Sequence, residues 1–252
     1  MTSETANPLS IVAVGAHMDD CWLGMGGTAL KALRKGHQVT MVTAVTDYEW
    51  LPYLAGRDAE IKPILQDLYD RTGIKQVSLK HGYMRLENNP ALVDEMSQVM
   101  FDLRPDILFC HAEDEDNQDH TALGAACRIA ALHGECFVKP SRGDFKYTFE
   151  IYQYTTGWQA RRFAPDTFVD VSDVMAEALE LCNTFDDLYA GGAAQRQLTV
   201  TDHPRGNRTF SLNGHARFKF AQSIAYGGGS AYAEGFQAYT RLPLEYRRLA
   251  RV

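Results

Sequence analysis

The sequence contains few cysteines, and they are not grouped. The 252 residues include an odd number of them, never spaced as Cys-x-x-Cys: Cys21, Cys110, Cys127, Cys136 and Cys182. This pattern argues against a disulfide framework and against a zinc site built from thiolates. We expect most of these side chains to be small buried hydrophobic groups.

Excess positive charge and long apolar runs are also absent. Lys and Arg number 25 against 32 Asp and Glu, a net charge of −7, so there is no basic surface for nucleic acid and a neutral or cationic small molecule fits better. No apolar run approaches the ~20 residues that span a bilayer. Residues Met1 to Ser10 lack the basic and apolar regions of a secretory signal. We therefore expect a cytoplasmic protein with no membrane or nucleic-acid partner, and leave open whether it is a homo-oligomer.

The composition is that of a folded globular protein, with 45% hydrophobic and 23% charged residues. Its length favours a single domain over residues 1–252. Ser10 to His17 is a β-branched apolar run, Trp22 to Lys35 has helical spacing up to Gly36, and Gln38 to Thr46 is a second apolar run. These segments predict a βαβ unit with a right-handed crossover. The expected fold is a Rossmann-like α/β domain, with a mostly parallel sheet and helices on both faces.

The alternation of helices and strands continues along the chain. Further helices are predicted at 57–72, 90–103 and 121–133, from Ser172 onward with Asp173 in the first turn, and near 215–225 and 231–239, the last two separated by Gly227 to Gly229. Further strands are predicted at 76–80, 106–111, 148–156 and 167–171. Leu123, Ala126, Ile129 and Ala130 are expected on one apolar helix face. The acidic stretch from Ala112 to Gln118 is expected to be a loop, with Glu113 to Asp116 solvated.

Two predicted strand ends carry His and Asp together. These are His17-Met18-Asp19-Asp20 and Asp119-His120. In open α/β sheets, ligands bind beyond the carboxyl ends of the strands. A hydrolytic zinc site needs about three protein ligands and an open position for water. His17, Asp20 and His120 would supply such a set.

Asp19 then has a separate role. Two adjacent carboxylates are costly in one site unless a cation neutralises one of them. With Asp20 on the metal, Asp19 is the candidate general base for a water molecule whose pKa the metal lowers to roughly 7. A structural interpretation stands beside this one, because a lone His at a strand end more often has a structural role and Asp19-Asp20 could cap a helix. His111, at another strand end, is more simply explained as structural.

These motifs resemble those of the PIG-L family of zinc-dependent N-deacetylases, also called LmbE-like proteins. The family pattern Ala-His-Pro-Asp-Asp-Glu stands here as Ala16 to Cys21, followed by Gly24 and Gly26-Gly27-Thr28, and the family's His-x-Asp-His corresponds to Asn117 to His120. Arg57-Asp-Ala-Glu60 resembles an Arg-x-x-Glu pattern, and Ala231 to Phe236 a final Ala-Glu-x-Phe. The resemblance covers most of the chain.

The resemblance implies zinc ligation by His17, Asp20 and His120, with another divalent transition metal as an alternative. It also implies general-base catalysis by Asp19 and substrate contact by Arg57. The implied reaction is removal of an acyl group, usually acetyl, from the amine of a small sugar-like or natural-product substrate. The acyl group, the scaffold and the physiological metal stay open.

Three departures from the family pattern affect these expectations. Met18 replaces Pro and Cys21 replaces Glu in the first motif, and the family's His-x-Ser-Gln is missing near Cys182. Asn117 replaces a His; it can donate a hydrogen bond to an oxyanion but cannot supply a proton. The alternative is a catalytically impaired metal- or ligand-binding member of the same fold. A nucleotide-binding function ranks lower, because no Gly-x-Gly-x-x-Gly follows the first strand.

Overall fold

The computed structural model describes residues 7–148, 150–156, 162–189, 219–223, 230–240 and 247–252. Its strands are β1 (Ser10–Gly15), β2 (Gln38–Asp47), β3 (Lys75–Gly82), β4 (Ile107–His111), β5 (Glu150–Tyr154), β6 (Thr167–Asp170) and β7 (Ala233–Ala238). Its α-helices are α1 (Asp20–Arg34), α2 (Asp58–Thr72), α3 (Pro90–Leu103), α4 (Gln118–His133) and α5 (Met175–Tyr189). Short 3-10 helices span Gly134–Cys136, Pro140–Arg142 and Arg248–Arg251.

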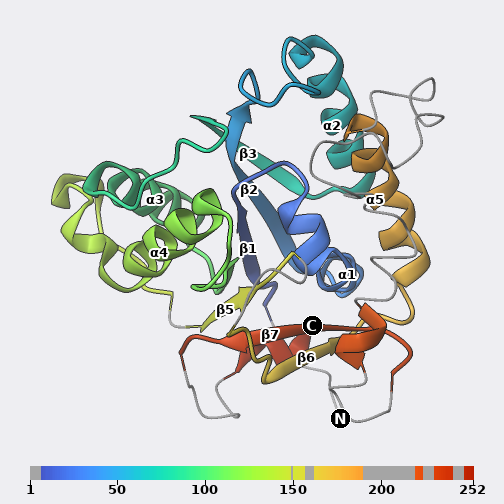
Figure 1. Cartoon of the computed structure of the whole chain (residues 1–252). Helices are drawn as coiled ribbons and strands as arrows, with labels where there is room; N and C mark the ends of the chain where they lie inside the picture. Colours follow the sequence, from blue (N-terminus) through green and yellow to red (C-terminus); the bar gives the residue numbers. More distant parts are fainter. Residues whose placement is uncertain (1–6, 149, 157–161, 190–218, 224–229, 241–246) are drawn as a thin grey trace, which may run out of the picture.

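The strands form one sheet in the order β3-β2-β1-β4-β5-β7-β6. The first five strands are parallel, and β7 runs antiparallel to both β5 and β6. Figure 1 shows α3 and α4 on one side of this sheet and α1, α2 and α5 on the other. The predicted Rossmann-like α/β fold with helices on both faces is confirmed.

The central strands are buried along their length because both of their faces are covered. All five residues of β4 and of β5 are buried, as is β1 from Ile11 to Gly15. Burial on both faces is typical of parallel strands between two helix layers. The core therefore lies on β1, β4 and β5, and their carboxyl ends lie close together at one edge.

Local signals set the helix ends where they were expected. In α3, Pro90 is the first residue and the Asn89 side chain accepts a hydrogen bond from the Leu92 amide at 3.1 Å. Helix α2 ends at Gly73, whose φ of 75° is the left-handed conformation that glycine adopts readily.

One predicted element was wrong, and two predicted helices begin at other residues. The segment 231–239 is not a helix, because β7 pairs with β5 on one side and β6 on the other, and no local periodicity reports such distant partners. Helix α5 begins at Met175 and not at Ser172, since the Ser172 hydroxyl accepts hydrogen bonds from the Ala231 and Tyr232 amides instead of capping a helix. Helix α4 begins at Gln118, which places Asp119-His120 in a first helical turn.

Other expectations are refined. Ile129 is 36% exposed, so it does not share the buried face of Leu123, Ala126 and Ala130. Residues 219–223 are helical, whereas the rest of the helix expected near 215–225 and the glycines at 227–229 lie outside the described part of the chain. All five cysteines are free thiols, and only Cys136 is exposed. No helix in the described residues is long and apolar enough to cross a bilayer.

Two of the motif glycines hold α1 against the sheet. A Cβ atom at Gly24 would lie 2.2 Å from the ring of Tyr154, and one at Gly27 would lie 2.7 Å from Val171. Helix α1 is interrupted at Met25, with φ of −144°. Just beyond, the buried Glu234 carboxylate accepts hydrogen bonds from the amides of Gly27 and Thr28 at 2.9 and 2.7 Å. The motif glycines and Glu234 thus position the start of α1, which carries Asp20.

Candidate metal centre

Two segments bring the three predicted ligands together. His17 follows β1, Asp20 is the first residue of α1, and His120 lies in the first turn of α4. All three are buried. The His17 Nδ1 and His120 Nε2 atoms lie 3.1 Å apart, and Asp20 Oδ2 lies 3.3 Å from each of these nitrogens. The sequence prediction that these three side chains converge agrees with this geometry.

The triangle of donor atoms has the size that a metal ion requires. Ligands at roughly 2.0–2.1 Å from a tetrahedral ion lie about 3.3 Å from one another. The three measured edges are 3.1, 3.3 and 3.3 Å. Two imidazole nitrogens and one carboxylate oxygen are also a donor set that zinc accepts with one position left for water. The residues present therefore fit a divalent transition metal.

Two further carboxylates, Asp119 and Glu115, contact the ring nitrogens of His17 and His120 that do not face Asp20. Asp119 Oδ2 lies 3.1 Å from His17 Nε2, and a Glu115 carboxylate oxygen contacts His120 Nδ1. Asp119 itself accepts hydrogen bonds from the amides of Met84 and Leu86 at 2.7 and 3.0 Å. Metal-binding histidines commonly hold their second nitrogen in this way, which sets the tautomer and ring orientation.

Glu115 corrects the expectation that residues Glu113 to Asp116 form a solvated stretch. Glu113 and Asp116 are exposed, but the Glu115 side chain has no exposed area and points at His120. Sequence reasoning missed this role because acidic neighbours on both sides concealed one buried carboxylate. The one available signal was that a metal-binding histidine usually has a carboxylate or carbonyl partner for its second nitrogen.

His111 lies next to two of the candidate ligands, Asp20 and His120. It is fully buried, and its Nε2 atom accepts a hydrogen bond from the Ala16 amide at 3.0 Å and lies 3.2 Å from Asp20 Oδ2. Its ring stacks on His120 with centroids 3.9 Å apart. His111, Glu115 and His120 also come close enough to form a second potential ligand group. The bond to Ala16 fits the structural role expected for His111, since it holds the segment that carries His17.

Charges within the cluster compensate one another. Burial alone would lower the pKa of His17, but Asp20 and the hydrogen bonds with Asp119 and Asp20 outweigh it and raise that pKa to about 9. The pKa of His120 is raised to about 10, against the effect of burial, by Asp20 and then by Glu115. Burial would raise the pKa of Asp20, but the surrounding imidazoles lower it well below its ordinary value. Without a metal, protons on the histidines therefore neutralise Asp20.

Asp19 is buried beside the ligands without joining their triangle. Burial, followed by the Asp20 charge, raises the pKa of Asp19 to about 6, while His17 and a hydrogen bond from the Tyr189 hydroxyl act in the opposite direction. A carboxyl group with a pKa near neutrality can both accept and return a proton. This environment is compatible with the general-base role predicted for Asp19.

Asn117 and Arg57, the other two predicted site residues, both form hydrogen bonds within the protein. Asn117 caps α4, because its side-chain Oδ1 accepts a hydrogen bond from the Asp119 amide at 2.8 Å. Arg57 is held by Glu60 and by the carbonyl oxygens of Tyr53 and Leu188. Neither belongs to the ligand group, and the oxyanion and substrate-contact roles expected of them stay predictions.

The two substitutions in the first motif have local structural roles. The Met18 amide donates a hydrogen bond to the Tyr48 hydroxyl at 3.0 Å, which a proline at this position could not do. Cys21 is buried with its Sγ 3.8 Å from the Tyr154 hydroxyl, and burial raises the pKa of this thiol. Cys21 is therefore a packed, protonated thiol.

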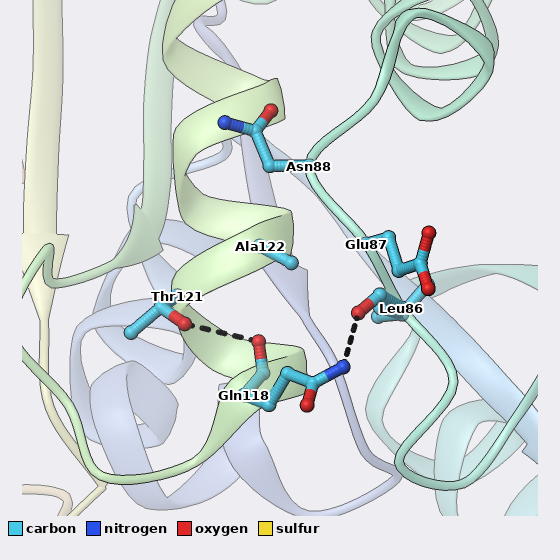
Figure 2. A pocket seen from close by; sticks show the side chains of 6 residues that line it. All are labelled: Leu86, Glu87, Asn88, Gln118, Thr121 and Ala122. Atoms are coloured by element: carbon cyan, nitrogen blue, oxygen red, sulfur yellow. Dashed lines mark hydrogen bonds between the residues drawn. The ribbon is translucent and has the colours of Figure 1, made fainter.

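A hollow of about 410 Å³ lies between the start of α4 and the segment 86–88 (Figure 2). Its lining residues are Leu86, Glu87, Asn88, Gln118, Thr121 and Ala122. Gln118 donates a hydrogen bond across it to the Leu86 carbonyl at 3.1 Å. The three candidate ligands do not line this hollow, so it is separate from the metal centre, although Leu86 and Gln118 flank Asp119.

The fold and the three-donor cluster define an α/β protein of Rossmann-like architecture with a candidate metal centre at the carboxyl edge of its sheet. Residues 12–131 of the chain match the PIG-L family, described as GlcNAc-PI de-N-acetylase. The matched segment contains all three candidate ligands.

Solved structures from three organisms share the fold. A conserved protein from Thermus thermophilus is 20% identical with a TM-score of 0.71, covering 95% of this chain and 99% of that one. The N,N'-diacetylchitobiose deacetylase of Pyrococcus horikoshii is 19% identical with a TM-score of 0.67, covering 94% and 87%. The 4-carboxy-2-hydroxymuconate hydratase GalB of Pseudomonas putida is 16% identical with a TM-score of 0.68, covering 93% and 98%. At these identities, the likeness concerns the fold.

Proposed function

We propose that this protein is a divalent-metal-dependent hydrolase that removes an acyl group, usually acetyl, from the amine of a small sugar-like or natural-product substrate. The observation that carries the proposal is the buried triangle of His17, Asp20 and His120 beside a fourth group, Asp19, that is free of the triangle. The match of residues 12–131 to a family described as a de-N-acetylase supports the reaction.

His17, Asp20 and His120 would hold the ion, and zinc suits their donor atoms. When bound, a divalent cation would acidify a water molecule and polarise the amide carbonyl. Asp119 and Glu115 keep the two imidazoles turned so that His17 Nδ1 and His120 Nε2 face Asp20. Once the protons on the two histidines are displaced, two neutral nitrogens and one carboxylate oxygen would face a single point.

Asp19 carries the proton. It takes a proton from the attacking water and returns it to the amine nitrogen as the carbon–nitrogen bond breaks, so the amide becomes a carboxylic acid and a free amine. The position at which the family has a second histidine holds Asn117, whose side chain cannot supply that proton. The amide Nδ2 of Asn117 is left to donate a hydrogen bond to the oxyanion, while its Oδ1 caps α4.

The substrate proposal is a small acylated amine. The Pyrococcus neighbour is a deacetylase of N,N'-diacetylchitobiose, and a further neighbour with a TM-score of 0.59 and 17% identity is a deacetylase of the A40926 pseudoaglycone. Both neighbours are thus named for removal of an acetyl group, one from a sugar and one from an antimicrobial compound. We also propose a cytoplasmic location for the enzyme.

Metal content and amide cleavage test the proposal together. Purified wild type, Asp20→Ala and His120→Ala would be analysed for metal after zinc reconstitution, and then assayed for free amine released from N-acetylglucosamine and N,N'-diacetylchitobiose. We expect about one zinc per chain in wild type and loss in both variants. Asp19→Asn is the matched control: it should retain the metal and lose turnover. Wild type that binds no metal would overturn the proposal, and bound metal without cleavage of any acetyl amine would favour the impaired binding member.

A second candidate function is addition of water without cleavage. The observation that favours it is Asn117, since a reaction with no leaving amine needs no acid at that position. A neighbour of the same fold is a hydratase. Mass spectrometry of products separates the two, because hydration gives one product heavier by water whereas hydrolysis gives two.

A further inference from the structure

Tyr189, the last residue of α5, donates a hydrogen bond from its hydroxyl to the Asp19 carboxylate. We infer that Tyr189 is the positioning residue of Asp19, and that Arg57 acts on the reaction by holding Tyr189 in place instead of by contacting substrate. This inference rests on the proposed function of Asp19 as the general base. Tyr189 was not among the site residues predicted from the sequence, and Arg57 was predicted to contact the substrate.

Asp19 needs such a partner because of where it lies. Its side chain is buried, and the next residue is the Asp20 carboxylate, whose charge repels it. A buried carboxylate is stable only when hydrogen bonds or charges replace the lost water. The Asp20 carboxylate has the imidazoles of His17 and His120 for this purpose. For Asp19, the Tyr189 hydroxyl supplies a hydrogen bond that also sets which way the carboxylate points.

Arg57 fastens the end of α5 that carries Tyr189. The last carbonyl groups of a helix have no partner within the helix. The Arg57 Nη1 atom donates to one of these, the Leu188 carbonyl, at 2.7 Å, and also to the Tyr53 carbonyl at 2.9 Å. The Tyr53 ring packs edge-on against the Tyr189 ring with centroids 6.1 Å apart. One guanidinium nitrogen thus holds two of the backbone segments around Tyr189.

The other two nitrogen atoms of the guanidinium group also donate hydrogen bonds within the protein. Arg57 Nε and Nη2 donate to the two carboxylate oxygens of Glu60 at 2.9 and 2.7 Å. Arginine has five N–H donors, and four hydrogen bonds to the protein leave little for a substrate anion. The Arg-x-x-Glu pattern is therefore explained here as a clamp on the C-terminal end of α5, in which Glu60 orients Arg57.

The test combines kinetics with a double-mutant cycle. Tyr189→Phe, Arg57→Ala and the double variant would be assayed with N,N'-diacetylchitobiose as zinc-loaded proteins, with metal content measured for each. We expect each single variant to lower kcat about tenfold or more with KM and zinc content unchanged. The double variant should be no slower than about threefold below the worse single one, since both act through Asp19. A rise in KM for Arg57→Ala, or losses that multiply in the double variant, would overturn the inference.

A second measurement does not depend on turnover. Thermal unfolding of the metal-free protein would be followed for Tyr189→Phe in the wild-type and Asp19→Asn backgrounds. Loss of a hydrogen bond to a buried carboxylate should lower Tm by about 2–6 °C in the first background and by less than half of that in the second. Tyr152→Phe is the control, because its hydroxyl also donates to a buried carboxylate, Glu150, at 3.0 Å, but outside the centre. It should not change kcat.

The two measurements separate this inference from the proposed function. If wild type cleaves no acetyl amine, the proposed function fails, and the unfolding cycle still decides whether Tyr189 holds Asp19. If wild type is active and Tyr189→Phe leaves both kcat and the cycle unchanged, the inference fails while the function stands. Arg57→Gln provides a second variant should Arg57→Ala not fold.

Discussion

The Nδ1 atom of His17 and the Nε2 atom of His120 face each other at 3.1 Å inside the protein. Two imidazolium ions at this distance would repel strongly, yet the neighbouring carboxylates raise the pKa of His17 to about 9 and that of His120 to about 10 against the effect of burial. The Asp20 oxygen between them relieves the repulsion only in part. A single divalent cation would replace these protons and satisfy all three donors at once.

Metal affinity should therefore rise with pH. Both histidines must be neutral to bind an ion, and in the metal-free protein their raised pKa values keep them protonated through pH 7. We expect each displaced proton to contribute about a tenfold gain in affinity per pH unit between pH 6.5 and 9. Calorimetric titration with zinc in buffers of different ionisation enthalpy measures both affinity and proton release. Release of no protons at pH 7 would contradict the assignment of the two histidines as ligands.

The stability of the metal-free protein should change with pH in the opposite direction. A group whose folded-state pKa is raised stabilises the fold fully below its unfolded pKa of about 6.5, and that contribution is lost as pH rises through the folded value. For His17 and His120 the loss spans the interval from about pH 6.5 to about 9–10. Thermal melts with chelator should show Tm falling across this interval. In His120→Gln the fall should be smaller, and a Tm that rises over the same interval would show that these histidines are not the controlling groups.

The supporting carboxylates should control metal binding without touching the metal. Asp119→Asn and Glu115→Gln each remove the charge behind one imidazole, and loss of such an outer partner typically costs roughly 10–100-fold in affinity. Glu113→Gln is a matched control, because Glu113 lies in the same loop and is exposed. Competition with a chromophoric zinc chelator measures all three. Equal affinities for Glu115→Gln and Glu113→Gln would rule out the supporting role of Glu115.

Gly24 should tolerate no side chain. A Cβ atom there would lie 2.2 Å from the buried Tyr154 ring, whose hydroxyl donates to the Val14 carbonyl at 2.9 Å. Because the Tyr154 ring is buried and its hydroxyl is held by this hydrogen bond, Gly24→Ala should destabilise the fold by about 1–3 kcal/mol. The comparison is Gly26→Ala, whose Cβ would lie 3.3 Å from Trp22 and should cost less. Urea unfolding of both variants measures the difference, and a Gly24→Ala protein as stable as Gly26→Ala would argue against this packing.

The sequence alone was enough for those parts of the protein that depend on neighbouring residues. Pro90 and Gly73 mark helix ends that the structure reproduces. The short runs rich in apolar and β-branched residues at β1, β2 and β4 are strands, as predicted. His17, Asp20 and His120 could be predicted to meet because each lies in the segment that follows a central strand. The parallel arrangement of these strands follows from the alternation of strands and helices along the chain.

Tertiary structure decided what depends on distant partners. Strand β7 was mistaken for a helix because its partners, β5 and β6, lie tens of residues away along the chain and leave no local periodicity. Arg57 and Leu188 are 131 residues apart, so no spacing in the sequence could show that the guanidinium is committed to the protein. Glu115 looked like its exposed acidic neighbours, and only the fold buries it against His120. Residue types and short spacings thus determined which donors exist, whereas long-range packing determined how each donor is oriented and paired.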